Sequence, residues 1–258
     1  MSWPFTRALI TGASSGIGES MVRMLTAERI PVVVVARRED RLRELAGSAS
    51  GADVEVLAAD LTDADGLAAV EERIADEDDP IDLVVNNAGF GTSGVFAELD
   101  VDRLDDEVRL NVLALTRLSH AALATMVPRG RGHLLNVSSV ASFQPAPKLA
   151  VYAATKAYVT NLTESLHEEA RGSGVKVTAL CPGLTRTEFQ EVSGSAHYSD
   201  QYPSFAWMTA DEVARTGLDD VAKGRALSVP GAMYKAVAAA SSMTPRSVIR
   251  RLSGLIQR

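Results

Sequence analysis

The amino-acid sequence predicts an α/β protein built on a doubly wound parallel β-sheet with helices on both faces. Short runs of β-branched residues alternate with longer segments of helical periodicity, as in sheets whose parallel strands are joined by helices. Most of the runs are continuously apolar, which is typical of strands buried on both faces. A glycine-rich turn follows the first run, and no repeat or linker divides the chain, so we expect a single domain over residues 1–258.

The expected elements alternate along the chain. Thr209 and Glu212 have the spacing of a capping box, which predicts that one helix begins near Ala210. Strands are expected at residues 7–11, 31–36, 54–58, 81–86, 133–138, 175–181 and 226–229. The other helices are expected at residues 16–29, 40–49, 63–77, 101–126 and 151–171.

The composition excludes several classes of protein. The net charge of -7 argues against nucleic acid as the main partner. Cys181 is the only cysteine, and the four histidines lack the spacing of metal ligands, so we expect neither an intramolecular disulfide nor a metal site. Neither a signal peptide nor an apolar run of membrane-spanning length is visible, so a cytoplasmic location is expected.

The charge is unevenly distributed along the chain. Residues 221–258 contain no Asp or Glu but seven Lys and Arg residues, so this basic C-terminal segment carries +7 and the preceding residues carry -14. Apolar residues between 248 and 256 have helical spacing. Such a helix could pack on the body of the protein or on a partner subunit, or it could contact an anionic membrane surface.

The first predicted strand leads into the turn TGASSGIG, residues 11–18. Glycines at a strand-to-helix junction allow close approach of the backbone, and the helix N-terminus offers free N–H groups to a pyrophosphate. The alternative is a tight turn without a ligand. The residues expected to bind a dinucleotide here are Gly12, Ser14, Ser15, Gly16, Ile17 and Gly18.

The end of the second predicted strand indicates which cofactor binds. In this type of fold an acidic residue about 20 positions after the glycine turn binds the ribose 2′-hydroxyl of NAD. Arg37 and Arg38 stand there instead, and guanidinium groups bind a 2′-phosphate through charge-assisted hydrogen bonds. We therefore expect NADP(H) rather than NAD(H). The alternative is that the two arginines only begin a solvated helix with ion pairs along it.

Two side chains with acid–base chemistry are one helical turn apart. Tyr152 and Lys156 are at positions i and i+4 of a predicted helix, so they share one face. A neighbouring cation lowers a tyrosine pKa from its usual value of about 10. Ser139, at the end of a predicted strand, could polarise a substrate carbonyl. The Tyr/Lys spacing alone is weak evidence, because such pairs also occur on helix surfaces.

The combination of these motifs resembles the short-chain dehydrogenase/reductase family, in the subgroup whose chains have about this length. The resemblance covers nearly the whole chain and implies a Rossmann-like fold. Its markers, in the family's order, are TGASSGIG, Asp60 in AADLTD, NNAG at 86–89, Asn111 in RLNVLA, Ser139, Tyr152 with Lys156, and PGLTRT at 182–187.

The resemblance implies catalytic roles for four residues. Tyr152 would be the general acid in reduction and the base in oxidation, and Lys156 would lower its pKa and bind the nicotinamide ribose. Ser139, rather than Ser138, would bind the substrate oxygen. Asn111 would interrupt its helix and support a water that links Lys156 to solvent; a hydrogen-bonded core amide is the alternative.

The resemblance also implies the remaining cofactor contacts and an oligomer. Relatives usually associate through the helices that carry Asn111 and Tyr152, so a homo-dimer or homo-tetramer is expected. The residues that would line the cofactor groove are Asp60 and Leu61 at the adenine, Asn87, Ala88 and Gly89 along the groove, and Pro182, Gly183, Thr185 and Thr187 at the nicotinamide.

Residues 188–207 contain five aromatic residues among Ser, Gly and Pro. A loop of this length is usually functional or disordered, and its aromatic content disfavours disorder. We expect a substrate lid; the alternative is a loop that only packs on the core. The residues expected to contact the substrate are Phe90, Ser139, Phe143, Tyr152 and Phe189.

The sequence therefore predicts an NADP(H)-dependent oxidoreductase that interconverts a ketone or aldehyde and an alcohol. The cofactor would supply the hydride and Tyr152 the proton. A lipid-like, steroid-like or aromatic substrate is expected rather than a sugar or a charged acid. Two alternatives stay open: a non-catalytic NADP-binding regulator, and an enzyme of the same family that catalyses epimerisation or dehydration.

Overall fold

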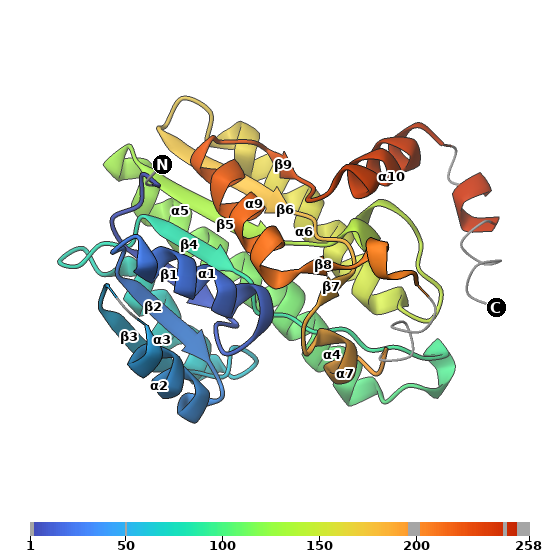
Figure 1. Cartoon of the computed structure of the whole chain (residues 1–258), viewed down its shortest axis with the longest axis horizontal. Helices are drawn as coiled ribbons and strands as arrows, with labels where there is room; N and C mark the ends of the chain where they lie inside the picture. The colour runs from blue at the N-terminus through green and yellow to red at the C-terminus, as the bar shows by residue number, and fades with distance from the viewer. Residues whose placement is uncertain (1–2, 50, 196–201, 245–246, 252–258) are drawn as a thin grey trace.

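Seven parallel strands form the centre of the fold in the computed structural model, which describes residues 3–49, 51–195, 202–244 and 247–251 (Figure 1). Their order across the sheet is β3-β2-β1-β4-β5-β6-β9, and every neighbouring pair is parallel. All seven predicted strands are confirmed to within two residues at each end. They are β1 (Ala8–Thr11), β2 (Val32–Ala36), β3 (Val54–Ala58), β4 (Leu83–Asn86), β5 (Gly132–Val137), β6 (Val175–Leu180) and β9 (Leu227–Ser228).

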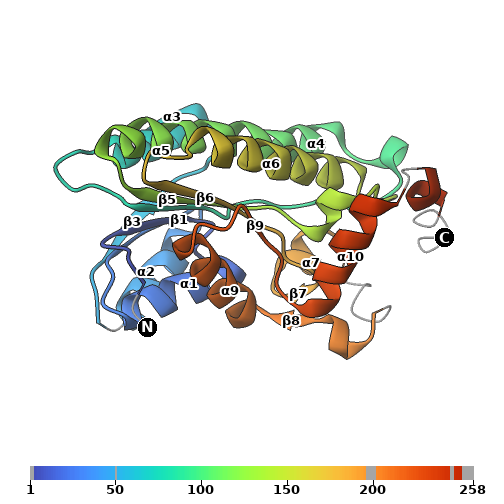
Figure 2. The same cartoon turned by 90° about the horizontal axis from the view of Figure 1, so that it is seen from above.

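Helices cover both faces of the sheet, as the alternating pattern predicts. Figure 2 shows one layer on each side of the strands, and each layer encloses its own apolar core. The first layer contains α1 (Gly16–Ala27), α2 (Glu39–Ser48) and α9 (Ala210–Ala222). The second contains α3 (Ala64–Ala75), α4 (Val101–Val108), α5 (Leu115–Arg129) and α6 (Ala150–Glu169).

The reversal of strand order beside β1 determines where a ligand can bind. The chain builds outward from β1 to β3 on one side and from β4 to β9 on the other. The loops after β1 and β4 therefore diverge to opposite faces and leave a crevice at the carboxyl ends of the strands. The strands β1 and β4 are buried throughout, so this crevice has a rigid floor.

The helix predicted at residues 101–126 is confirmed but is not regular. A π-helical turn, Arg109–Ala114, separates α4 from α5, and Gly130 ends the helix in the left-handed conformation with φ of 69°. The whole helix is long and apolar enough by composition to cross a membrane. In this fold, however, Leu118, Ala122 and Met126 are packed into the core beneath the sheet.

The region after β6 contains elements that the sequence pattern does not predict. A two-stranded parallel sheet joins β7 (Thr185–Arg186) to β8 (Met208–Thr209), and these strands flank the expected lid. The short helix α7 (Phe189–Val192) lies within that segment, and α10 (Ala232–Met243) follows β9. The predicted capping box of Thr209 and Glu212 is confirmed at the start of α9.

The basic C-terminal segment supplies β9 and α10 to the fold. Residues 247–251 are helical, in agreement with the helical spacing of the apolar residues there. Leu252, Leu255 and Ile256, which belong to the same pattern, lie outside the described residues.

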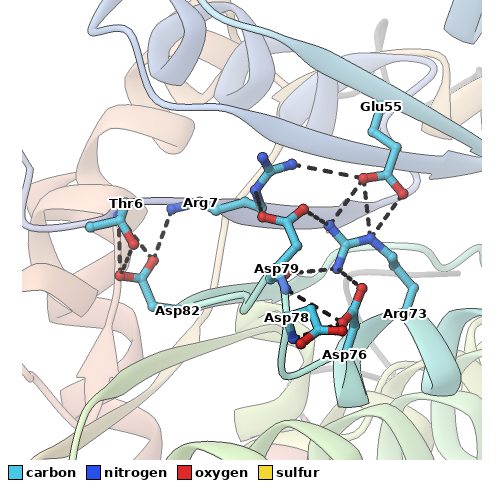
Figure 3. A network of polar contacts seen from close by, with 8 residues as sticks. All are labelled: Thr6, Arg7, Glu55, Arg73, Asp76, Asp78, Asp79 and Asp82. Atoms are coloured by element: carbon cyan, nitrogen blue, oxygen red, sulfur yellow. Dashed lines mark hydrogen bonds and ion pairs between the residues drawn. The ribbon is translucent and has the colours of Figure 1, made fainter.

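A network of ion pairs closes the opposite, amino-terminal edge of the sheet (Figure 3). Arg73 of α3 donates from Nε and Nη2 to the carboxylate of Glu55 in β3, at 2.8 and 3.0 Å, and from Nη2 to Asp79 at 2.7 Å. Asp82 accepts hydrogen bonds from the backbone N–H groups of Thr6 and Arg7. These contacts fix the starts of β1, β3 and β4 relative to one another, far from the crevice.

Candidate active site

A groove of about 1080 Å³ crosses the carboxyl edge of the sheet. It starts at the glycine turn after β1, passes the ends of β2 and β4, and continues between β5, α6 and the segment after β6. Clefts of this size with few polar groups are typical ligand sites. The structure brings nearly all sequence-predicted site residues to its wall. The exceptions are Gly18, Asn111 and Phe143, which lie behind it.

The glycine turn has the geometry of an anion cradle. Gly12 and Gly16 have positive φ of 65° and 58°, conformations that favour glycine. Ser15 caps α1 without a side-chain hydrogen bond, so the first N–H groups of α1 remain available to a phosphate. Gly18 lies beneath the turn, where a Cβ would come within 2.5 Å of the Gly12 carbonyl oxygen. Gly18 therefore serves the packing of the turn, which corrects the expectation of a direct cofactor contact.

Two polar side chains hold this turn against the end of β4. The Thr11 hydroxyl accepts hydrogen bonds from the N–H groups of Asn87 and Ala88, each at 3.0 Å. The Asn87 amide donates to the carbonyls of Thr11 and Gly12 at 2.9 and 3.1 Å. Asn87 thus shapes the groove wall by fixing the turn. Thr11 has the same function but was not among the predicted site residues.

The expected phosphate-binding arginines lie at the end of β2, and each of them is near a carboxylate. Arg38 donates to Ser14 Oγ at 3.1 Å and to Glu188 Oε2 at 3.0 Å, and Arg41 donates to Glu188 Oε1 at 2.5 Å. Hydrogen bonding to Arg41 and Arg38 lowers the pKa of Glu188. An anionic side chain from the lid therefore occupies the guanidinium groups that a 2′-phosphate would use. Neither Arg41 nor Glu188 was predicted from the sequence.

The side chain of Arg37 is 70% exposed, and its Nη1 lies 3.8 Å from Asp60 Oδ2. Asp60 accepts hydrogen bonds from the N–H and the hydroxyl of Thr62, at 2.9 and 2.7 Å. Burial disfavours the charge of Asp60, but the Thr62 bonds and Arg37 together lower its pKa. Asp60 and the buried Leu61 form the expected adenine end of the groove wall.

The structure distinguishes Ser139 from Ser138. The Ser138 hydroxyl donates to the backbone carbonyl of Lys156 at 2.8 Å and contacts Thr160 at 2.7 Å, so its bonding capacity is used in the core. The Ser139 hydroxyl accepts from the N–H of Ala141 at 3.1 Å and forms a hydrogen bond with Tyr152. Both serines line the groove, and Ser139 is the one whose hydroxyl interacts with Tyr152; its contact with a substrate stays a prediction.

Burial dominates the electrostatics of Tyr152 and Lys156. Burial raises the pKa of Tyr152 to about 12, and the hydrogen bond with Ser139 opposes this rise. Burial also lowers the pKa of Lys156 to about 8. The Lys156 Nζ donates to the Val137 carbonyl at 2.8 Å and lies 5.8 Å from the centre of the Tyr152 ring. In this arrangement the effect of burial on the Tyr152 pKa prevails, and the expectation that Lys156 lowers that pKa stays a prediction.

Asn111 lies in the π-helical turn, behind the groove wall. Its amide donates to the Phe90 carbonyl at 2.8 Å and to the Thr155 hydroxyl at 3.2 Å, and its Oδ1 accepts from the Phe90 N–H at 3.2 Å. A Cβ on Gly89 would lie 2.8 Å from Asn111 Oδ1 and 3.4 Å from Lys156 Nζ. The interrupted helix is confirmed, and the glycine at position 89 allows Asn111 and Lys156 to approach the same point.

The segment after β6 lies over Tyr152. The Phe189 ring contacts the Tyr152 ring at a centroid distance of 5.2 Å. Tyr234 of α10 packs on Gly183, donates to the Ala206 carbonyl at 2.6 Å and accepts from the Leu184 N–H at 3.0 Å. It therefore joins both ends of the predicted lid to α10. No sequence motif marks Tyr234, since its partners lie in separate segments.

Apolar side chains form the part of the groove beyond Tyr152. Phe90 and Phe189 lie on the wall as predicted, whereas Phe143 packs into a small core cluster around Cys181 and Tyr234. The prediction that Phe143 contacts substrate is corrected accordingly. Tyr198, also in the expected lid, lies outside the described residues. Further apolar wall residues, which the sequence did not indicate, are Leu110, Val140, Leu149, Val192, Phe205, Met233 and Val237.

No group of three or more His, Cys, Asp or Glu side chains within the described ranges could hold a metal ion. Cys181 is fully buried, and burial raises its pKa to about 11. A thiol in this state is unreactive. The groove thus offers a phenol, a lysine amine and a serine hydroxyl next to the glycine turn.

Comparison with known proteins identifies similar sequences. A family model described as short chain dehydrogenase matches residues 6–197. An uncharacterized oxidoreductase of Staphylococcus epidermidis is 35% identical over 184 residues, which are 71% of this chain and 80% of the relative. An uncharacterized oxidoreductase of Staphylococcus aureus is 33% identical over 180 residues, 70% of this chain and 78% of the relative.

Two solved structures are similar over almost the whole chain. A short-chain dehydrogenase from Sphingobium yanoikuyae in complex with NADPH is 36% identical with a TM-score of 0.82, covering 92% of this chain and 93% of that one. A bulky-bulky ketone specific alcohol dehydrogenase from Comamonas testosteroni is 31% identical with a TM-score of 0.78, covering 94% and 96%.

Replacement of Gly18 tests the packing of the turn. We expect Gly18→Ala to lower stability by roughly 1–3 kcal/mol, because the new methyl group overpacks the backbone of Gly12, and to weaken dinucleotide binding. Thermal denaturation and coenzyme fluorescence titration measure the two effects. Gly47→Ala is the control, since nothing lies within 4 Å of its Cβ position, and helix propensity should raise its stability by about 0.5–1 kcal/mol. A Gly18→Ala protein with wild-type melting and binding would contradict this account.

Proposed function

This chain belongs to the short-chain dehydrogenase family, and we propose that it reduces the carbonyl group of bulky apolar ketones or aldehydes with NADPH. One observation carries the proposal. Tyr152, Ser139 and Lys156 meet at the point where a glycine-lined, phosphate-binding groove becomes an apolar pocket. In that position a hydride donor and a carbonyl carbon can lie side by side, with a proton donor within reach of the carbonyl oxygen.

The residues of the groove fit a nicotinamide cofactor. The free N–H groups of α1 suit the pyrophosphate, and Thr187, which contacts the Gly16 position, lies with Thr185 and Gly183 on the wall beside Tyr152. When bound, the nicotinamide supplies or accepts the hydride. Lys156, close to Gly89 on the same wall, is placed to bind the ribose.

The side chains of this chain would handle the proton and the developing charge. In reduction, negative charge grows on the carbonyl oxygen, and hydroxyl groups of Ser139 and Tyr152 would stabilise it. Tyr152 then gives its phenolic proton to that oxygen, which yields the alcohol. Burial raises the pKa of Tyr152 to about 12, so the phenol carries the proton that reduction requires.

The preference for NADP(H) rests on the arginines at the end of β2. Arg38 and Arg41 already bind a carboxylate, that of Glu188, so the same donors can bind a 2′-phosphate. No acidic side chain takes the place at the end of β2 where one would receive the 2′-hydroxyl of NAD. The similarity to a dehydrogenase crystallised with NADPH supports the same choice.

The apolar substrate class rests on the wall beyond Tyr152. Phe90, Phe189 and Met233 are among the apolar residues that line it, and such side chains favour an apolar substrate over a sugar. A structural neighbour with 31% identity is described as specific for bulky-bulky ketones, which agrees with this class.

Association of subunits would use the outer face of α4 and α6. A shallow hollow there is lined by Phe96, Val108, Val112, Ala154 and Tyr158, among others, and several of these side chains are exposed, Phe96 at 62%. Contiguous exposed apolar surface of this kind marks interaction sites. We propose that a second copy of the chain covers this face in the cytoplasm.

The first prediction concerns the proton donor. We expect Tyr152→Phe to lower the turnover of NADPH with bulky aromatic or steroid-like ketones by roughly 10²–10⁴-fold, the usual contribution of a general acid. Its affinity for NADPH should remain close to that of the wild type, since the ring is retained. NADPH absorbance and fluorescence titration give the two readings.

Two outcomes of that assay would favour the alternatives. A wild-type protein that binds NADPH but oxidises it with no member of a broad carbonyl panel would be a coenzyme-binding regulator. Products of inverted configuration or with water removed would indicate an epimerase or a dehydratase.

The second prediction concerns the choice of coenzyme. Loss of one charge-assisted hydrogen bond costs about 1.5–3 kcal/mol, so we expect Arg38→Gln to raise the dissociation constant of NADPH by about tenfold or more and to leave that of NADH nearly unchanged. Arg43→Gln is the matched control, because Arg43 is exposed in α2 and pairs with Glu39. Equal losses for both coenzymes would disprove a role in phosphate recognition.

The third prediction concerns assembly. Light scattering should give a mass of two or four chains for the wild type, and Phe96→Asp should shift it toward the monomer because a carboxylate must then be buried. Met243→Asp, which changes an exposed side chain of α10 that does not line this hollow, should not change the mass. A monomeric wild type would refute the proposed interface.

A further inference from the structure

A carboxyl group is buried directly behind the catalytic tyrosine and lysine. Glu107 in α4 has no exposed surface. Among the residues that the structure describes, neither of its oxygens has a well-formed hydrogen-bond partner, and the nearby Thr92 hydroxyl has none either. A carboxylate in such a place costs stability unless a charge compensates it. Its position beside the reaction centre therefore requires an explanation.

The fold directs Glu107 toward α6. Glu107 lies four residues before Asn111, at the point where α4 passes into the π-helical turn. The helix α4 packs against α6, and Glu107 is buried within this layer. The amide of Asn111 reaches Thr155, the neighbour of Lys156 in the chain. Glu107 is thus enclosed on the side of α4 where the chain approaches the helix that carries Lys156.

The charged and titratable groups around Glu107 come from two elements. Lys156 from α6 and Arg103 from α4 itself, one turn earlier, favour the carboxylate, and so does Thr92. Burial is the larger effect, and it raises the pKa of Glu107. In return, Glu107 raises the pKa of Lys156 and that of Tyr152. Glu107 therefore interacts with both acid–base residues of the site.

We propose that Glu107 is a positioning residue whose buried carboxylate is the internal counter-ion of Lys156, holding that lysine as an ammonium and Tyr152 as a phenol. Arg103 is exposed and is occupied at the surface, where it stacks on Phe90 and donates to the Val192 carbonyl. The Val137 carbonyl gives Lys156 only a neutral acceptor. Cys181 also raises the pKa of Lys156, but burial raises the pKa of that thiol to about 11, so it is neutral at pH 7. Glu107 is then the group that supplies the compensating charge.

The proposed function gives this pairing a consequence. When Tyr152 has given its proton to the product oxygen, the remaining phenolate is stabilised by a nearby ammonium, and a neutral Lys156 could not provide it. By favouring the ammonium and disfavouring the phenolate before the transfer, Glu107 poises the site for reduction. The electrostatic pairing itself does not depend on which substrate the enzyme uses.

The pairing can be measured without a substrate. The chain has only five lysines, so full-length protein labelled with ¹³C at lysine Cε permits each titration to be followed by NMR, with Lys156 assigned from Lys156→Arg. In Glu107→Gln we expect the midpoint of the Lys156 titration to fall by about half a unit or more, because the lysine loses its counter-charge. Glu107→Asp retains a carboxylate, so its Lys156 midpoint should lie close to that of the wild type.

The control is Asp105→Asn, which removes one exposed carboxylate from the same helix and changes the net charge equally. It should leave the Lys156 titration where it is in the wild type. An unchanged Lys156 midpoint in Glu107→Gln would overturn the proposal, and so would an equal shift in Asp105→Asn. If Glu107→Gln does not fold, Glu107→Met, which has a similar size and no polar group, replaces it in the same measurement.

Stability against pH provides a second reading. The folded-state pKa of Glu107 is raised, so ionisation of this buried group lowers the stability of the fold. This loss of stability is absent at pH values below the ordinary carboxyl pKa, and it grows as the pH rises from there to the folded-state pKa. Glu107→Gln should therefore melt higher than the wild type at neutral pH but not in acid. If reduction occurs, the kcat of this variant should fall with rising pH, and this fall should begin at a lower pH than in the wild type. The KM should be retained. Failure of activity alone would count against the proposed function and not against the pairing.

Discussion

The burial of Lys156 at the end of β5 is the constraint on which the reaction centre depends. Its side chain is only 4% exposed; its ammonium donates to Val137 and its backbone carbonyl accepts from Ser138. These two bonds hold α6 against β5, and α6 in turn carries Tyr152 to Ser139. A lysine is rarely buried in this way unless other groups compensate its charge. The nearby carbonyl and carboxylate groups provide this compensation.

The sheet provides the rigid frame for that centre. Because β1 and β4 are adjacent although they are far apart in the sequence, the glycine turn and the NNAG segment meet at one edge. Thr11 and Asn87 then tie the two loops together through backbone groups. These bonds fix the two loops relative to each other, which preorganises this end of the groove.

The C-terminal third of the chain covers the groove and gives it an apolar end. The paired strands β7 and β8 bring the two ends of the lid together, and Tyr234 joins these ends to α10. The basic C-terminal segment thus contributes directly to the pocket, since Met233, Tyr234 and Val237 line it.

The sequence by itself determined the strand and helix order, the glycine turn, and the chemistry of Ser139, Tyr152 and Lys156. Each of these depends on residues close in the chain, where periodicity and spacing have a direct structural meaning. It also predicted the interruption at Asn111, although only by resemblance. It did not predict that Phe143 and Gly18 pack behind the groove, because a local pattern does not show which face of a loop is covered.

Only the tertiary structure decided which charges meet. Glu188 reaches Arg38 across 150 positions of sequence, and Glu107 acts electrostatically on Lys156 from a different helix. No local periodicity relates such residues, since their approach depends on how the sheet and its helices pack. The same holds for the raised pKa of Tyr152: the sequence shows a tyrosine beside a lysine, but the burial that governs its proton exists only in the folded chain.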